Sequence, residues 1–208
     1  MKFIMSYSCG KDSTLALHHM IAQGNEPVAL LTMVNQDADR SFFHGADYPM
    51  LRAYSDALGI PFLPVPAAGE NYHLAMERSL KEAAALGAEA ACFGDIDIEG
   101  SRAWCEARCR NAGLKAVFPL WHRDRGENVR QLVALGYQCL IKSINNTLLP
   151  KSLLAGSLTR RSLLLCVTAA SISAARTANI IRWSWTGRYS TGRLPIRPAE
   201  FWISATIP

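Results

Sequence analysis

The chain has 208 residues, and half of them are apolar, which is enough for one globular α/β domain with a buried core. No apolar run is long enough to span a membrane, and the N-terminus lacks the pattern of a signal peptide. Six cysteines at irregular spacing indicate reduced thiols rather than a disulfide framework. These features predict a cytoplasmic protein with no membrane partner.

The net charge of +5 is unevenly distributed along the chain. Residues 157–208 carry seven arginines, no lysine and one acidic residue, Glu200, whereas the preceding residues are nearly neutral. The main body therefore does not predict a nucleic-acid partner. The arginine-only tail is a break in composition that needs its own explanation.

Strand and helix patterns alternate along the first 145 residues, which indicates an α/β fold with a parallel sheet and helices on both faces. The predicted strands, in chain order, cover residues 2–7, 27–34, 60–67, 89–96, 115–121 and 137–145. The predicted helices cover residues 13–23, 48–59, 71–88, 99–113 and 125–136. Open sheets of this kind bind ligands at the carboxyl ends of their strands, so the loops after the strands are the candidate site.

The loop after the first strand has the composition of an anion-binding turn. It joins a strand to a helix, which places free backbone N–H groups beside the positive end of the helix dipole. Gly10 allows close approach of a ligand, and Lys11 adds a positive charge. Asp12 would repel a phosphate unless a cation lies between them, so it indicates magnesium bound with a nucleotide. The loop consists of Ser8, Cys9, Gly10, Lys11, Asp12 and Ser13.

The spacing of this loop matches neither the Walker pattern nor G-x-G-x-x-G. It resembles the PP-loop, S-G-G-K-D-S, of ATP pyrophosphatases, which cleave ATP between the α- and β-phosphates. Cys9 stands where that pattern has glycine, so we expect a negative φ at Cys9 and a side chain directed away from the phosphates. The alternative is an ordinary strand–turn–helix junction that is capped by Asp12 or Ser13.

Further stretches extend the resemblance over residues 1–155, namely LLTMVNQDADRSFFHG, LGIPF, CFGDIDIEGSRAWCE, GLKAVFPLW and LGYQCLIKSIN. Together they resemble the diphthine–ammonia ligase family of adenine-nucleotide α-hydrolase-like proteins. The resemblance implies a Rossmann-like fold of the HUP type. It also implies ATP-dependent amidation, in which a carboxylate is adenylated with release of pyrophosphate and ammonia displaces AMP. In eukaryotic and archaeal members the carboxylate belongs to diphthine, a modified histidine of elongation factor 2, and the acceptor of this chain is left open.

The resemblance implies ATP and Mg²⁺ as ligands of the PP-loop. The loop from Ser8 to Ser13 would bind the triphosphate, with Lys11 and Asp12 in catalytic roles and Asp12 on Mg²⁺. Thr32 and Met33, at the end of the second strand, would face the adenine.

Two further loops receive roles from the same resemblance. Gly94 would lie beside the phosphates, and Asp95 would make a second magnesium or substrate contact. His44 and Gly45 would close over the substrate. The alternatives are that Asp95 only caps the following turn and that His44 is a surface histidine of its loop.

Other functions are compatible with a PP-loop. One is another ATP pyrophosphatase, such as a tRNA-modifying thiolase, although paired cysteines and an RNA-binding domain are not evident. Another is a protein that binds adenine nucleotides without catalysis.

The family pattern G-E-N-G-E-Y-H-T, followed by a strand and D-G-P-I-F, is missing from the C-terminal part of this chain. When the reading frame is shifted by two nucleotides, the codons of residues 176–181 allow N-G-E-Y-H and those of residues 183–190 allow V-V-D-G-P-I-F. We therefore predict a PP-loop ATP-binding domain over residues 1–155 and an irregular tail over 156–208. The tail is interpreted as a frameshift product, from a sequencing error or a pseudogene.

The alternative is a divergent basic tail that binds nucleic acid. If the frameshift hypothesis holds, the chain lacks the segment that completes the substrate side of the site. We then expect weak ATP binding and no ligation by this polypeptide.

Overall fold

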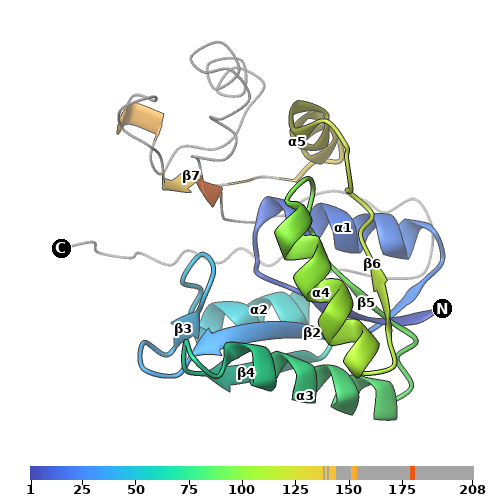
Figure 1. The fold of residues 1–208 in the computed structure, drawn as a ribbon. Helices are drawn as coiled ribbons and strands as arrows, with labels where there is room; N and C mark the ends of the chain where they lie inside the picture. Colours follow the sequence, from blue (N-terminus) through green and yellow to red (C-terminus); the bar gives the residue numbers. More distant parts are fainter. Residues whose placement is uncertain (138, 140, 144–150, 154–178, 181–208) are drawn as a thin grey trace.

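Five parallel strands form the centre of the fold in the computed structural model, which describes residues 1–137, 139, 141–143, 151–153 and 179–180. They lie in the order β4-β2-β1-β5-β6 (Figure 1). The chain proceeds from β1 outward to β4 on one side and then crosses back to β5, so the order reverses between β1 and β5. This is the Rossmann-like arrangement that the sequence predicts, and it makes the carboxyl ends of β1 and β5 the expected ligand site. Their bounds are β1 (Lys2–Ser6), β2 (Glu26–Asn35), β4 (Phe62–Ala67), β5 (Ala90–Cys92) and β6 (Lys115–Val117).

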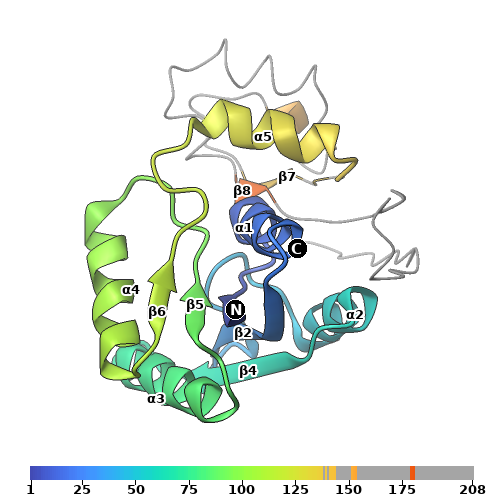
Figure 2. The ribbon, with the colours of Figure 1, turned by 90° about the vertical axis from the view of Figure 1, so that its right-hand side faces the viewer.

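Helices cover both faces of the sheet, as predicted (Figure 2). On one face lie α1 (Lys11–Ala22) and α2 (Tyr48–Leu58), with α5 (Arg125–Ala134) packed against α1, and on the other lie α3 (Tyr72–Ala85) and α4 (Glu99–Asn111). Two hydrophobic cores result, one on each side of the sheet.

Strand β1 contributes to both cores because successive side chains of a strand point to opposite faces. Phe3 and Met5 lie in the core with α1, whereas Ile4 lies in the core with α3. All three are fully buried, which explains why the strand is continuously apolar rather than alternating.

Local signals set the ends of the helices. The side chain of Asp47 accepts a hydrogen bond from the Met50 N–H at 3.0 Å and caps α2, and Gly59 ends that helix with a left-handed φ of 65°. Helix α1 begins at Lys11, two residues before the predicted start. The reason is that Gly10 has an extended backbone and takes the N-cap position.

The polar loop after β2 contains a short strand that sequence patterns do not indicate. Strand β3 (Arg40–Ser41) runs antiparallel to the end of β2 and pairs with Val34 and Asn35. The side chain of Asn35 accepts hydrogen bonds from the N–H groups of Asp37 and Ala38, which turns the chain back on itself. This hairpin brings the segment around His44 toward the carboxyl edge of the sheet.

The last predicted strand, over residues 137–145, does not extend the parallel sheet. Strand β7 (Ile141–Ser143) pairs instead with β8 (Asn179–Ile180) in a separate antiparallel sheet. A 3₁₀ helix, η1, covers Lys151–Leu153. The domain boundary at residue 155 and most of the tail predicted as irregular lie outside the described residues, although residues 179–180 within it form a strand. No helix in the described ranges combines the length and the apolar character needed to cross a membrane.

Candidate functional site

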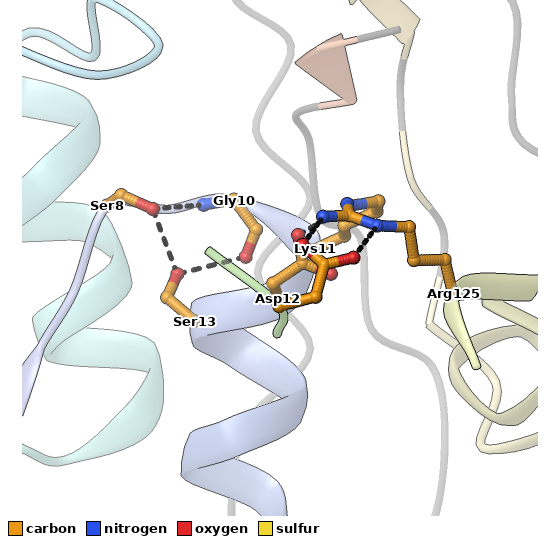
Figure 3. A network of polar contacts seen from close by, with 7 residues as sticks. Ser8, Gly10, Lys11, Asp12, Ser13 and Arg125 are labelled. Carbon is orange, nitrogen blue, oxygen red and sulfur yellow. Dashed lines mark hydrogen bonds and ion pairs between the residues drawn. The ribbon is translucent and has the colours of Figure 1, made fainter. Parts of the chain in front are cut away.

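The PP-loop is held by a closed set of hydrogen bonds between two serine side chains and one glycine (Figure 3). The Gly10 N–H donates to Ser8 Oγ at 3.3 Å, and the Ser13 hydroxyl donates to the Gly10 carbonyl at 3.0 Å. The two hydroxyls also share a hydrogen bond of 3.1 Å. Because the single proton of Ser13 goes to Gly10, Ser8 is the donor in the third bond. The loop therefore has a fixed shape before a ligand binds.

The N-terminus of α1 is open toward this loop. Its N-cap is Gly10, and the described residues supply no side-chain cap there. Neither Asp12 nor Ser13 takes the N-cap position among the described residues, and an ordinary strand–turn–helix junction stays the alternative. The first-turn N–H groups and the helix dipole remain available to an anion.

Cys9 differs from the expectation in its backbone and agrees with it in its side chain. Its φ is +61°, so the expected negative φ is wrong: the PP-loop has a left-handed residue at this position, where the family pattern has glycine. The side chain is fully buried in the core beside α1, away from the open side of the loop. Burial raises the pKa of the Cys9 thiol, which keeps the thiol protonated and unreactive.

Lys11 and Asp12 form an ion pair within the loop. The Lys11 ammonium lies 2.5 Å from Asp12 Oδ2, and the lysine side chain is only 10% exposed. The other oxygen, Asp12 Oδ1, is buried and has no hydrogen-bond partner among the described residues. A buried carboxylate oxygen without a donor is the kind of ligand that Mg²⁺ prefers, so the residues present fit this metal.

Gly94 places the loop after β5 directly against the first turn of α1. A Cβ atom on Gly94 would lie 2.7 Å from the backbone nitrogen of Ser13 and 2.8 Å from the carbonyl carbon of Asp12. Only glycine allows this approach, so Gly94 lies beside the PP-loop, while its predicted place beside the phosphates stays a prediction.

Asp95 follows at once and lies near Asp12. Burial raises the pKa of the Asp95 carboxyl, and the charge of Asp12 raises it further. Two neighbouring carboxylates favour a cation between them. In the part of the chain that the structure describes, no cluster of three or more His, Cys, Asp or Glu side chains could hold a metal. A magnesium ion at Asp12 and Asp95 would therefore take its remaining ligands from phosphate oxygens and water.

The side chains of Thr32 and Met33, the two residues expected to face the adenine, are buried. The Thr32 hydroxyl donates to the Tyr7 carbonyl at 2.7 Å and ties β2 to the end of β1. Met33 packs in the core with Val65 and Met76. Only the backbone of these two residues is left for a nucleotide, and such a contact stays a prediction.

His44 lies against the PP-loop rather than on the open surface of its own loop. A Cβ atom on Gly10 would lie 2.4 Å from His44 Nε2, so the imidazole occupies the space beside the glycine. His44 and Gly45 both have left-handed backbones, with φ values of 69° and 59°. The hairpin thus brings His44 to the site, while closure over a substrate stays a prediction.

A cleft of about 620 Å³ opens next to Asp95 on the α3 and α4 side of the sheet. Among the described residues that line it there is no lysine or arginine. The Tyr72 ring lies 5.8 Å from that of Trp104 and 6.4 Å from that of Phe43, measured between centroids. Sequence reasoning found only Asp95 among the side chains that shape this cleft, which are chiefly those of Phe43, Tyr72, Met76, Phe93, Asp95 and Trp104.

Comparisons with known proteins find similar sequences in one family. The family described as "Diphthamide synthase N-terminal domain" matches residues 1–116. Proteins named diphthine–ammonia ligase are similar to this chain in Saccharomyces cerevisiae, with 26% identity over 168 residues, and in Schizosaccharomyces pombe, with 24% over 162 residues. These matches cover 70% and 68% of this chain but 24% and 26% of the two relatives, so the chain spans about a quarter of their length.

A solved structure with a similar fold is titled as a predicted subunit of tRNA methyltransferase from Methanocaldococcus jannaschii. It is 14% identical, with a TM-score of 0.49, and the alignment covers 87% of this chain and 95% of that one.

Proposed function

The chain belongs to the diphthamide synthase N-terminal domain family, and from this premise we propose that its fold serves an ATP-dependent ligase that forms an amide. The observation that carries the proposal is the close approach of Gly94, the neighbour of Asp95, to the backbone of Asp12 and Ser13 at the open N-terminus of α1. An anion site with two carboxylates beside it suits a nucleotide that is bound with a divalent cation.

The proposal gives roles to the start of α1, to two charged residues of the PP-loop and to Asp95. The first-turn N–H groups of α1 and the Lys11 ammonium hold the phosphates, while Asp12 and Asp95 hold Mg²⁺. The metal, when bound, neutralises charge on the phosphates and on the pyrophosphate that leaves. The protein contributes position and charge, so no side-chain nucleophile is required.

The cleft beside Asp95 is proposed to receive the acceptor. In the reaction, a carboxylate oxygen of the acceptor attacks the α-phosphorus, and the bond to the β-phosphate breaks with release of pyrophosphate. Ammonia then attacks the acyl carbon, gives up a proton and displaces AMP, which leaves the amide. Asp95 lines the cleft and directly follows Gly94, which packs against the first turn of α1, so a ligand in the cleft lies next to the phosphate site. The names of the relatives suggest diphthine as the class of acceptor.

The products of ATP test this proposal. A chain whose C-terminal frame has been restored is incubated with ATP, Mg²⁺, ammonium and a diphthine-containing protein, and ³¹P NMR identifies the products. We expect AMP and pyrophosphate, with formation that requires the acceptor. The 208-residue chain, run in parallel, is expected to bind ATP without turnover. Formation of ADP and phosphate by the restored chain would refute the proposal, because it places the broken bond at the γ-phosphate.

A further inference from the structure

The loop between β5 and α4 carries Asp95 and is anchored to α5 by an ion pair. From this contact we infer that Arg125 is a positioning residue, which holds Asp95 toward the PP-loop through Asp97. The inference rests on the proposed role of Asp95 at the metal and extends it to residues that sequence reasoning missed.

The contact between Arg125 and Asp97 is bidentate. Arg125 Nε donates to Asp97 Oδ2 at 2.9 Å, and Arg125 Nη2 donates to Asp97 Oδ1 at 2.5 Å. The arginine side chain is only 15% exposed, although it belongs to the first residue of a helix. A guanidinium that meets a carboxylate through two parallel bonds fixes orientation as well as distance. Figure 3 draws Arg125 close to the residues of the PP-loop.

Asp95 lies between fixed points on both sides. Before it, Gly94 packs against the backbone of the first turn of α1. After it, the Ile96 carbonyl accepts a hydrogen bond of 2.7 Å from the His122 N–H, and the Ile96 side chain is buried. Asp97 is then held by Arg125. Asp97 lies only two positions after Asp95, so the stretch between Asp95 and the ion pair spans at most about 7 Å of extended chain.

Asp95 lines the cleft and lies in the loop between β5 and α4, so no regular element fixes its side chain. The anchor at Asp97 limits how far this loop can move. Loss of the anchor should therefore weaken metal binding without removing any metal ligand.

Arg130 on the same helix is a matched control. It is 54% exposed and pairs with Asp124 and Glu127, which belong to α5 and its N-cap. The ion pairs of Arg130 stay within α5 and its N-cap, whereas the ion pair of Arg125 connects α5 to the loop that carries Asp95.

The test measures Mn²⁺ binding by electron paramagnetic resonance with the 208-residue chain and α,β-methylene-ATP. We expect Arg125→Ala and Asp97→Ala each to weaken Mn²⁺ binding about tenfold, as loss of an outer partner of a metal ligand does. The double variant should be no weaker than either single variant, because the two residues act as a unit. Arg130→Ala should bind Mn²⁺ as the parent chain does.

Two further readouts keep the inference open to refutation. Arg125→Lys retains the charge but not the two-pronged contact, so its Mn²⁺ affinity should lie between those of the parent and Arg125→Ala. If Arg125→Ala does not fold, Arg125→Lys should still bind Mn²⁺ more weakly than the parent chain does. Melting temperatures show which variants are folded. Parent-like Mn²⁺ binding by Arg125→Lys and Arg125→Ala, or additive effects in the double variant, would overturn the inference. If the parent chain itself binds no Mn²⁺ with the nucleotide, the proposed function fails instead.

Discussion

Cys9 has a backbone conformation that an L-residue adopts at a cost of roughly 1–2 kcal/mol, because its Cβ atom approaches the following carbonyl. We therefore expect Cys9→Gly to be more stable than Cys9→Ala by about 1 kcal/mol, since only glycine relieves the left-handed strain. Urea unfolding under reducing conditions measures the difference.

Cys92 is the matched control for this prediction. It is equally buried but lies in the regular strand β5. At this position the order of stability should reverse, so that Cys92→Ala is more stable than Cys92→Gly by roughly 0.5–1 kcal/mol. An alanine advantage at both positions would contradict the assigned conformation of Cys9.

Asp95 makes the stability of the fold depend on pH in a direction opposite to that of an ordinary ion-paired carboxylate. Its pKa is raised in the folded state, mainly by burial, so ionisation opposes folding. The loss of stability is absent below about pH 3.8, the pKa of Asp95 in the unfolded chain. It develops as the pH rises through the higher pKa of Asp95 in the folded state. Asp95→Asn should therefore raise the melting temperature at pH 7, and the gain should vanish below about pH 3.8. Equal melting temperatures at pH 7 would show that the carboxyl is not buried as described.

The residues of the site differ in how well a sequence can reveal them. The PP-loop is found because its residues are contiguous and their spacing is specific. The cleft is not found, because Phe43, Tyr72, Asp95 and Trp104 come from four separate segments and are ordinary residues in each of them. The left-handed φ of Cys9 and the buried positions of Thr32 and Met33 depend on tertiary packing, so local patterns do not indicate them.

At the scale of elements, the first turn of α1 and the loop after β5 act as one unit. Gly94→Ala would place a methyl group within 2.9 Å of three backbone atoms of Asp12 and Ser13. We expect it to destabilise the fold by about 1–3 kcal/mol and to weaken nucleotide binding, because a helix backbone must shift. Chemical denaturation and nucleotide titration measure the two effects.

Gly100 and Gly10 provide the comparison for Gly94. A Cβ atom on Gly100, in α4, meets nothing within 4 Å, so Gly100→Ala should be neutral or slightly stabilising. A Cβ atom on Gly10 meets chiefly the tip of His44, a side chain that can move. Gly10→Ala should therefore cost less stability than Gly94→Ala. If Gly94→Ala were as stable as Gly100→Ala, the close approach of β5 and α1 would be wrong.

Most elements are predicted from periodicity and capping residues, since the apolar patterns and the glycines at helix ends are local. The exceptions have physical reasons. Strand β3 is too short to show a pattern, and its pairing arises from the turn at Asn35. Strand β7 has the composition of a sheet strand, but its partner is β8, which lies far along the chain.

At the scale of the whole molecule, the frameshift hypothesis concerns the segment that follows residue 155. Its prediction is genetic: the coding DNA should contain an apparent single insertion or deletion near codon 156, whose correction restores N-G-E-Y-H and D-G-P-I-F. Resequencing of the gene and its transcript measures this. If no single change restores both motifs, the hypothesis fails, and the arginine-only tail is then to be tested for nucleic-acid binding.

The central claim is that Asp12 and the N-terminus of α1 form the site for a nucleotide with Mg²⁺. The most direct test is an amide ¹H–¹⁵N NMR titration of the 208-residue chain with Mg²⁺ and α,β-methylene-ATP. We predict weak but saturable shifts that centre on residues 8–14 and 94–97, that are lost in Asp12→Asn, and that remain in Asp37→Asn, an exposed control. Saturable shifts that persist in Asp12→Asn, or the absence of any shift in the parent chain, would contradict the account.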